Sequence, residues 1–285
     1  MIRESLVPEP PARPAPLRCG PAVFEFGRRT FLAGIVNMTP DSFSGDGLNG
    51  DAGAAEAMGQ RWKEQGADLI DVGGQSTRPR AVRVPVDEEL RRTIPAVRRL
   101  VPLALPVSVD TSSARVAAAA LDAGAAMVND VTALTGDRAM AGVVARAGVS
   151  VVLMDGRNRR GAVDIVAETR AYLADRLRAA EAAGIEPVRV VIDPGYGFGV
   201  TLAQNMEMLR RLGELKVLGR PILIGTSRKG SIGRVLNLPV DQLMEGTAAT
   251  IVIAIANGAD FVRAHDVRAM VRVARMTDAI VRGLP

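Results

Sequence analysis

The sequence predicts a single (β/α)8 barrel, and three observations lead to that prediction. Short apolar runs alternate with longer segments of helical periodicity along nearly the whole chain. There are eight units of each kind, whereas an open doubly wound sheet usually has fewer strands. The chain has 285 residues, which is enough for one such barrel of about 250 residues.

The apolar runs are typical of strands that are buried on both faces of a parallel sheet. Each run is short, is bounded by Gly, Pro, Asn or Asp, and lacks the strict alternation of a half-exposed strand. The predicted strands cover residues 31–36, 68–72, 107–109, 126–128, 150–154, 189–192, 221–224 and 260–262.

The segments between these runs repeat their apolar residues at the spacing of a helix. Several of them end just before a glycine, which is the expected stop because glycine adopts the left-handed conformation at little cost. These glycines are Gly66, Gly124, Gly148, Gly184 and Gly258. The predicted helices cover residues 51–65, 87–100, 112–123, 137–147, 162–183, 203–212, 243–257 and 266–281.

The first residues differ in composition from the rest of the chain. Residues 1–22 are rich in proline, and we expect a flexible extension there, followed by one domain over residues 23–285. The extension lacks the apolar core of about 7–15 residues that a secretory signal needs. No apolar run approaches the roughly 20 residues of a membrane span, so we expect a cytoplasmic protein with no membrane partner. Cys19 is the only cysteine, which excludes an internal disulfide and a thiolate metal cluster.

The net charge of +5 raises the question of a nucleic-acid partner. The basic residues are scattered over the predicted helices and often stand beside acidic ones. Aromatic residues make up only 3% of the chain, which is poor for the stacking of bases. We therefore interpret the charge as solvated helix faces with a weaker attraction for anionic substrates, and we expect no nucleic-acid partner.

Polar residues follow several predicted strands, where a barrel of this kind carries its catalytic groups. Asp110, Asn129 and Asp193 follow the third, fourth and sixth strands. Each could simply cap the next helix, as these residue types commonly do. Together at one barrel mouth, they would offer the donors and acceptors that a flat heterocycle with amide and amine edges needs. Asp71 lies one step inside its strand end, so we expect a buried structural carboxylate there.

The loops after the last two strands are the usual phosphate site of such barrels. Ser227, Arg228 and Lys229 stand in the turn after the seventh strand, which could also be an ordinary exposed basic loop. Arg263 and His265 end the eighth strand two residues apart, where extended geometry places both side chains on one side. His265 is the only histidine, and arginine with histidine can hold a diphosphate.

Two long loops complete the predicted mouth. Asn37 follows the first strand, where asparagine is commonly a turn or cap residue. Its amide oxygen also suits Mg2+, which often needs only one protein group besides the phosphate oxygens of a substrate. Residues 43–50 contain Gly45 and Gly47 and are a candidate lid, and the loop 73–86 carries Thr77 and Arg78.

Seven motifs in this order resemble the signatures of the dihydropteroate synthase family: VNMTPDSFS, DVGGQSTRP, VSVDT, VNDV, VIDPGYGFG, GTSRKG and RAHDV. The resemblance covers about residues 31–275, and each motif follows its expected strand. It implies an enzyme that joins a dihydropterin carrying a hydroxymethyl diphosphate to p-aminobenzoate, with loss of diphosphate. It also implies Mg2+ as cofactor and a homodimer, for which the apolar helix 243–257 is a candidate interface.

The resemblance further implies roles for single residues. One group would bind the pterin or line its pocket: Asp110, Asn129, Asp193, Lys229 and Met154. A second group would bind the diphosphate, with the asparagine near Mg2+: Asn37, Arg263 and His265. Ser227 is a further candidate for substrate binding. A third group would face p-aminobenzoate: Thr77, Arg78 and Phe198.

The sequence also departs from the family pattern at four positions. The family commonly has histidine after Leu-Met, glycine after Thr-Arg-Pro, lysine after Gly-Phe-Gly and serine after Ser-Arg-Lys. This chain has Asp155, Arg80, Val200 and Gly230 at those positions. None of them belongs to the pterin or diphosphate groups, so the departures point to an altered arylamine side.

Two other functions stay open from the sequence. A pterin-dependent methyltransferase shares the pterin pocket, but a methyl-folate has no diphosphate and gives the Ser-Arg-Lys and Arg-x-His elements no role. A pterin-binding paralogue without turnover would bind the pterin diphosphate and release no product. Retention of a corrinoid would indicate the first, and binding without diphosphate release would indicate the second.

Overall fold

The computed structural model describes residues 13–40, 47–76 and 84–284. Eight parallel strands form its central sheet: β3 Phe31–Asn37, β4 Leu69–Gly73, β5 Val107–Asp110, β6 Met127–Asp130, β7 Ser150–Met154, β8 Val190–Asp193, β9 Leu223–Ile224 and β10 Phe261–Ala264. Their order in the sheet is β8-β7-β6-β5-β4-β3-β10-β9. A parallel bridge from Ile192 to Ile222 links β8 to the residue before β9, so the sheet closes into the predicted barrel.

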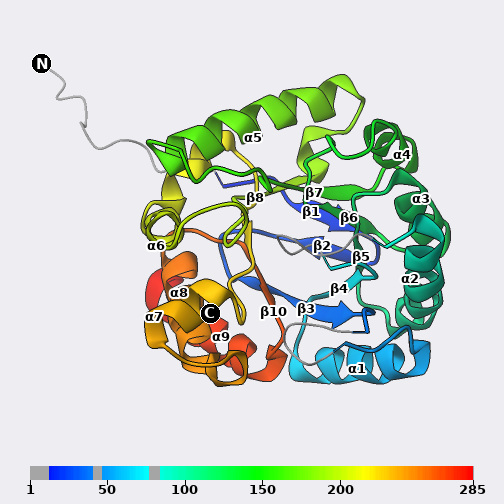
Figure 1. The fold of residues 1–285 in the computed structure, drawn as a ribbon, viewed down its shortest axis with the longest axis horizontal. Coiled ribbons are helices and arrows are strands. Elements are labelled where there is room, and N and C mark those ends of the chain that lie inside the picture. The colour runs from blue at the N-terminus through cyan, green and yellow to red at the C-terminus, as the bar shows by residue number, and fades with distance from the viewer. Residues whose placement is uncertain (1–12, 41–46, 77–83, 285) are drawn as a thin grey trace, which may run out of the picture.

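Nine α-helices occur in the described residues and surround the strands (Figure 1). They are α1 Ala52–Gln65, α2 Val86–Leu100, α3 Ala114–Asp122, α4 Met140–Ala147, α5 Ile165–Ala182, α6 Leu202–Arg210, α7 Gly230–Leu236, α8 Met244–Ala256 and α9 Val267–Arg282. Short 3-10 helices cover Val101–Leu103, Pro187–Arg189, Leu212–Leu218 and Val240–Gln242. Eight α-helices match the predicted segments. The extra helix, α7, was not predicted because its sequence contains glycine and serine, which are weaker helix formers than alanine or leucine.

The ends of the helices follow from local sequence. Asp51, Ser113 and Thr201 accept backbone N–H groups from the first turns of α1, α3 and α6. Gly66 ends α1 with a φ of 93°, a left-handed conformation that strains other residues. The predicted starts and stops are therefore set by hydrogen bonds that each helix end would otherwise lack.

A short antiparallel hairpin, β1 Leu17–Cys19 with β2 Ala22–Phe24, precedes the barrel. Leu17 and Phe24 are buried in one cluster with Phe31 and Phe261, the first residues of β3 and β10. The hairpin therefore covers the amino end of the barrel, and burial of each large side chain contributes about 1.5–3 kcal/mol. The expected boundary between residues 22 and 23 falls inside this hairpin, and residues 1–12 lie outside the described part.

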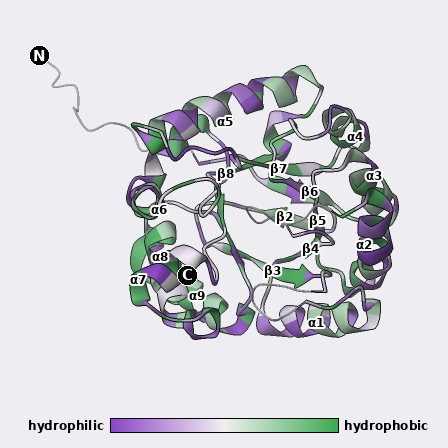
Figure 2. Ribbon diagram, viewed as in Figure 1, coloured by the Kyte–Doolittle hydropathy of each residue, from purple (hydrophilic) through white to green (hydrophobic). Residues whose placement is uncertain are grey.

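The barrel strands are buried along nearly their whole length, as their apolar sequences require. In Figure 2 the strands are mostly hydrophobic, while hydrophilic residues gather along α2 and α5. No helix among the described residues combines the length and the apolar character that a bilayer crossing needs. The packed interior leaves the carboxyl ends of the strands as the place where polar groups can meet.

Candidate active site

A cavity of about 380 Å³ opens at the carboxyl ends of the barrel strands. This size is typical of small-molecule sites, which measure roughly 300–1,000 Å³. Ten of the twelve predicted site residues line it: Asn37, Asp110, Asn129, Met154, Asp193, Phe198, Ser227, Lys229, Arg263 and His265. The other two, Thr77 and Arg78, lie outside the described residues. Side chains far apart in the sequence therefore meet around one cavity.

The acids and the amide at the strand ends are not helix caps. The cap of α3 is Ser113 rather than Asp110, and the cap of α6 is Thr201 rather than Asp193. The residue before α4 is Ala139, ten positions beyond Asn129. All three polar side chains line the cavity, which excludes the capping interpretation.

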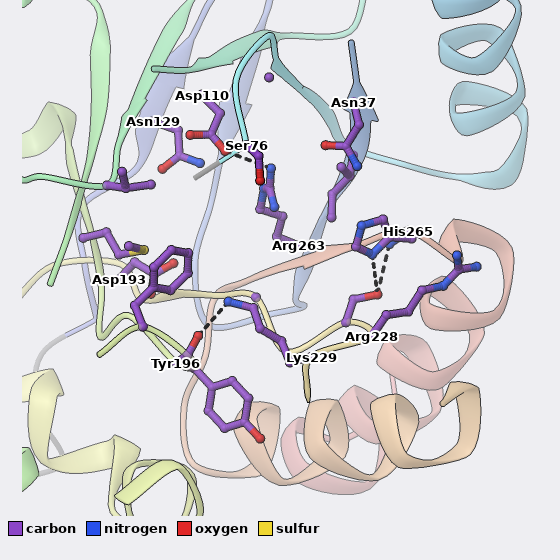
Figure 3. Close-up of a pocket in the computed structure, with 18 of the residues that line it drawn as sticks. Asn37, Ser76, Asp110, Asn129, Asp193, Tyr196, Arg228, Lys229, Arg263 and His265 are labelled. Atoms are coloured by element: carbon purple, nitrogen blue, oxygen red, sulfur yellow. Dashed lines mark hydrogen bonds and ion pairs between the residues drawn. The ribbon is translucent and has the colours of Figure 1, made fainter. Parts of the chain in front are cut away.

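Figure 3 shows these groups on one side of the cavity and Asn37, His265 and Arg228 on the opposite side. Arg263 and Lys229 lie between the two sides. The two sides differ in chemistry, because acids and an amide stand on one and mainly donors and cations on the other. Such a division suits a ligand with a polar ring at one end and an anionic group at the other.

Arg263 connects two buried carboxylates. Its Nε lies 2.6 Å from Oδ2 of Asp71, and its Nη2 lies 3.1 Å from Oδ2 of Asp110. Asn129 also donates its side-chain amide to Asp71, at 3.2 Å. Asp71 is buried, as expected from its place inside β4, and it holds the arginine and the asparagine in position.

Asp110 lines the cavity and keeps unused acceptor capacity. Among the described residues its Oδ1 atom has no hydrogen-bond partner, although the carboxyl group is buried. Burial raises the pKa of Asp110, the positive charge of Arg263 opposes that rise, and the charge of Asp71 adds to it. A buried acceptor of this kind is costly unless a ligand supplies the donor.

Asp193 and Lys229 face each other across the site with opposite pKa shifts. Burial raises the pKa of Asp193 to about 6, opposed by the backbone N–H of Gly195 and by the charge of Lys229. Burial lowers the pKa of Lys229 to about 8, opposed mainly by Asp193. The lysine Nζ donates to the carbonyl of Tyr196 at 2.6 Å and lies 4.2 Å from the ring centroid of Phe198. Opposed shifts in one cavity are typical of functional sites.

The turn after β9 and the end of β10 form the lip of the cavity. The Ser227 hydroxyl lies 3.0 Å from Nδ1 of His265 and accepts the backbone N–H of the same histidine at 3.2 Å. Arg228 donates to both oxygens of Asp266, at 3.0 and 2.6 Å. The basic turn is therefore tied to the neighbouring strand end rather than being an ordinary exposed loop.

Asn37 is the predicted metal ligand, and it ends β3 at the lip. Among the described residues, no three His, Cys, Asp or Glu side chains lie close enough together to hold a metal ion. Mg2+ does not need such a cluster, because it commonly keeps several waters and takes few protein ligands. The amide oxygen of Asn37 could hold it together with diphosphate oxygens and water. The residues present therefore fit a magnesium ion that arrives with an anionic substrate.

The four departures from the family pattern occupy different environments. Gly230 lines the cavity, whereas Val200 and Asp155 are buried and are not part of its lining. Arg80 lies outside the described residues. Of the three departures that the structure describes, only Gly230 stands where it can meet a substrate directly.

Sequence reasoning placed Arg228 in the candidate phosphate turn and Gly230 at the arylamine side, and both line the cavity. It assigned no role to the other lining residues: Ile35, Thr39, Gly73, Gln75, Ser76, Val131, Tyr196, Gly197 and Gly225. Several belong to motifs that were recognised, such as Gln75 and Ser76 after β4 and Tyr196 after β8. Their place after a strand was a signal for a role at the mouth. Nothing in the pattern shows that Tyr196 contributes its backbone carbonyl rather than its ring.

Comparisons with known proteins agree with this site. A family model described as pterin binding enzyme matches residues 33–265. The dihydropteroate synthase of Clostridium beijerinckii is 42% identical over 268 residues, which cover 93% of this chain and 100% of that protein.

Solved structures give the same result. The dihydropteroate synthase of Xanthomonas albilineans with 4-aminobenzoic acid has a TM-score of 0.88 at 43% identity, covering 95% of this chain and 100% of that one. The same enzyme in complex with 7,8-dihydropteroate has a TM-score of 0.85 at 42% identity, with 95% and 100% covered.

Proposed function

The chain belongs to the pterin-binding enzymes and, within them, to the dihydropteroate synthases, and on this premise we propose how its barrel mouth carries out the reaction. The enzyme is a transferase of folate synthesis. The amine nitrogen of p-aminobenzoate attacks the methylene carbon of the dihydropterin, the bond from that carbon to the diphosphate oxygen breaks, and the amine loses a proton. The products are 7,8-dihydropteroate and diphosphate.

The pterin ring is bound by the acids and the amide deep in the cavity. Asp110 and Asp193 accept hydrogen bonds from the amine and amide edge of the ring, and Asn129 supplies both a donor and an acceptor. The buried Oδ1 atom of Asp110 supports this assignment, since a ring N–H would satisfy it. Met154 lines the same part of the cavity and offers apolar contact.

The diphosphate is bound at the lip by Arg263, His265 and Ser227. The bonds of Arg263 to Asp71 and Asp110 use two of its N–H groups, which leaves donors for phosphate oxygens. Asn37 is the protein group that would hold Mg2+ beside the diphosphate. When bound, the ion would neutralise part of the charge that develops on the departing group.

The protein contributes mainly electrostatic stabilisation and positioning. As the diphosphate departs, positive charge develops on the methylene and the pterin ring, and negative charge develops on the leaving oxygen. Asp193 and Asp110 stand on the ring side, where anions stabilise the first charge, and Arg263 stands where a cation stabilises the second. The arylamine is a neutral nucleophile held close to the carbon, so no strong base is needed.

The p-aminobenzoate side is formed by Phe198, beside the Lys229 that reaches the pterin ring. The predicted Thr77 and Arg78 lie outside the described residues. Phe198 offers a ring face for stacking, with the lysine Nζ 4.2 Å from its centroid. Gly230 stands here without the hydroxyl that the family commonly has. We therefore expect weaker binding of the carboxylate of p-aminobenzoate than in relatives with serine.

The observation that carries the proposed site is the convergence of Asp110, Asn129, Asp193, Lys229 and Arg263 on one cavity. The test is to incubate the purified protein with the dihydropterin diphosphate, p-aminobenzoate and Mg2+ and to measure dihydropteroate. Isosteric variants Asp193→Asn and Lys229→Met should lose most turnover while their unfolding transitions stay cooperative. Unchanged turnover in both variants would remove the assignment.

We also propose that the protein acts as a cytoplasmic homodimer. Residues Met244, Val252 and Ile253 of α8 and Met276 and Ile280 of α9 are exposed apolar side chains on adjacent helices. Apolar surface of this kind suits a second copy of the chain. Ile253→Glu should shift the mass in analytical ultracentrifugation from dimer to monomer, and a monomeric wild-type protein would contradict the proposal.

A further inference from the structure

The turn at residues 194–199, directly after β8, carries two contributions to the site. The carbonyl of Tyr196 accepts from Nζ of Lys229 at 2.6 Å, drawn in Figure 3, and the ring of Phe198 lies beside the same Nζ. The ladder between β7 and β8 ends with the pair Met154 and Asp193. The ladder hydrogen bonds of the sheet therefore do not extend to the turn, and other contacts must fix its position.

Arg159, in the loop between β7 and α5, provides those contacts. Its guanidinium donates to three carbonyls of the turn: Pro194 at 3.0 Å, Gly195 at 3.3 Å and Phe198 at 3.2 Å. Its backbone N–H donates to the carbonyl of Gly199 at 2.6 Å. One residue thus holds the turn at both ends, including the residue that carries the aromatic ring.

The guanidinium of Arg159 is itself fixed in a buried position. The residue is only 4% exposed, and it also donates to the hydroxyl of Thr169 on α5 at 2.6 Å and to the carbonyl of Asp155 at 2.8 Å. Burial lowers the pKa of Arg159, and the charge of Asp155 opposes that effect. A buried cation needs a compensating charge, because unpaired it costs several kcal/mol.

Asp155 supplies the compensating charge. It is fully buried, its Oδ2 lies 3.1 Å from Nη1 of Arg159, and it accepts two further bonds from Arg157, both at 2.9 Å. Its backbone N–H donates to the carbonyl of Asp193 at 3.0 Å. The carboxylate therefore ties the end of β7 to the arginine that holds the turn after β8.

The two loops also approach too closely for side chains to lie between them. A Cβ atom on Gly195 would lie 2.0 Å from the carbonyl oxygen of Asp155, and one on Gly199 would lie 2.3 Å from that of Arg157. Both glycines have positive φ angles, 71° and 57°. The backbone of the turn therefore packs directly against the backbone of the loop that carries Asp155 and Arg159. Because no side chain separates the two, we expect a shift of that loop to displace the turn.

We propose that Asp155 and Arg159 are positioning residues for the arylamine side of the reaction. They set the position of the Phe198 ring and of the Tyr196 carbonyl. The ring would contact p-aminobenzoate directly, and the carbonyl fixes the Lys229 ammonium beside that ring. The inference rests on the proposed placement of p-aminobenzoate beside Phe198. Neither residue lines the cavity, so their effect on the substrate is indirect.

The test is steady-state kinetics of Arg159→Gln and Asp155→Asn, with each substrate varied in turn. Both variants should raise KM for p-aminobenzoate about tenfold. Loss of one charge-assisted hydrogen bond costs about 1.4 kcal/mol, and that free energy corresponds to a factor of about ten. KM for the dihydropterin diphosphate should rise much less, because the strand ladders hold Asn129 and the backbone of Asp193, and only the side chains of Asp193 and Lys229 contact the turn from the pterin side. If the two residues acted only on stability, the variants would not raise KM for one substrate more than for the other.

Arg211→Gln is the matched control. Arg211 is also bound by carboxylates, with Asp164, Glu207 and Glu214 as partners, but it does not touch the turn. Its substitution should leave both KM values unchanged. If Arg159→Gln does not fold, Asp155→Asn keeps the arginine and the backbone contacts and remains a valid test.

Phe198→Ala separates this inference from the proposed arylamine site. If it raises KM for p-aminobenzoate and the Asp155 and Arg159 variants do not, the inference is wrong and the site stands. If Phe198→Ala has no effect on that KM, the placement of p-aminobenzoate fails and the inference fails with it. Equal losses for both substrates in the Asp155 and Arg159 variants would also overturn the inference.

Discussion

The substitution Asp193→Asn should make the protein more stable at neutral pH and nearly inactive. Asp193 is buried, and its carboxyl group stands in the cavity near Lys229. Asparagine keeps the shape and can still accept the backbone N–H of Gly195, which lies 2.7 Å from Oδ1. What disappears is the negative charge, which the proposed mechanism needs and the folded protein tolerates poorly.

The magnitude follows from the pKa of the carboxyl group. Burial raises the pKa of Asp193 to about 6, against about 3.9 in an unfolded chain. At about 1.4 kcal/mol for each pKa unit, the ionised group costs the fold about 3 kcal/mol. Between about pH 4 and pH 6 the folded state binds more protons at this site, so its contribution to stability is lost as the pH rises.

The asparagine side chain does not ionise, so the Asp193→Asn variant does not lose unfolding free energy at this site as the pH rises. From pH 4 to pH 6.5, the free energy of unfolding of the variant should therefore rise relative to wild type by about 2 kcal/mol. The comparison stops at pH 6.5 so that Lys229, whose pKa burial lowers to about 8, stays charged. Over the same range, turnover of the variant should be lower by at least about 100-fold.

The measurement is urea unfolding of both proteins at pH 4, 5 and 6.5, together with turnover at pH 6.5. Asp164→Asn is a control of opposite sign, because hydrogen bonds from Arg211 and from the backbone of Ala167 lower the pKa of Asp164. Because its lowered pKa places its titration below about pH 4, that variant should be less stable than wild type by a nearly constant amount from pH 4 to pH 6.5, and it should keep its turnover. A stability difference for Asp193→Asn that does not change with pH would refute the reasoning.

Three further predictions concern the reaction itself. The wild-type kcat/KM should fall below about pH 6, where Asp193 gains a proton, and above about pH 8, where Lys229 loses one; a profile flat from pH 5 to 9 would contradict both assignments. Arg263→Met should lower kcat/KM at least about 100-fold, and its unfolding free energy should recover at low pH as Asp110, whose pKa burial raises, takes up a proton. Asn37→Ala should raise the Mg2+ concentration for half-maximal turnover about tenfold in a metal titration, and an unchanged requirement would exclude it as a ligand.

The barrel could be predicted because its signals are local. The run 150–154 matches β7 to the residue, and the glycines after the helices lie where they were expected. The run 221–224 gave only the two-residue β9, because Pro221 has no N–H to donate and Ile222 forms a single bridge. The hairpin at the amino end was missed because strands of three residues are too short to show a period.

The location of the site could also be predicted, since strand ends in a barrel are close in space wherever they stand in the sequence. The partners of the site residues could not. Arg263 and Asp71 are separated by 192 positions, and no spacing rule connects them. Arg159 is one of many arginines in the sequence, and only the fold shows that this one is buried.

The departure at Asp155 shows why single positions are hard to interpret from sequence. Asp155 stands next to Met154, which lines the cavity, so its replacement of the family's histidine suggested a changed arylamine pocket. Side chains alternate along a strand, and the carboxylate of Asp155 points away from the cavity into contact with two arginines. In this chain the residue therefore bears on how the neighbouring turn is held, which is the role that we propose for it.

The arrangement of charges explains why one arginine serves both ends of the site. Bond cleavage separates charge along the line from the pterin ring to the diphosphate. Asp110 and Asp193 lie at one end of the cavity and His265 at the other, with Arg263 between them in Figure 3. These groups come from strand ends that the barrel holds rigidly, so little reorganisation is needed when the charges develop. Because Arg263 is bonded to both Asp71 and Asp110, a phosphate that binds it as proposed would polarise the hydrogen bonds of the same network.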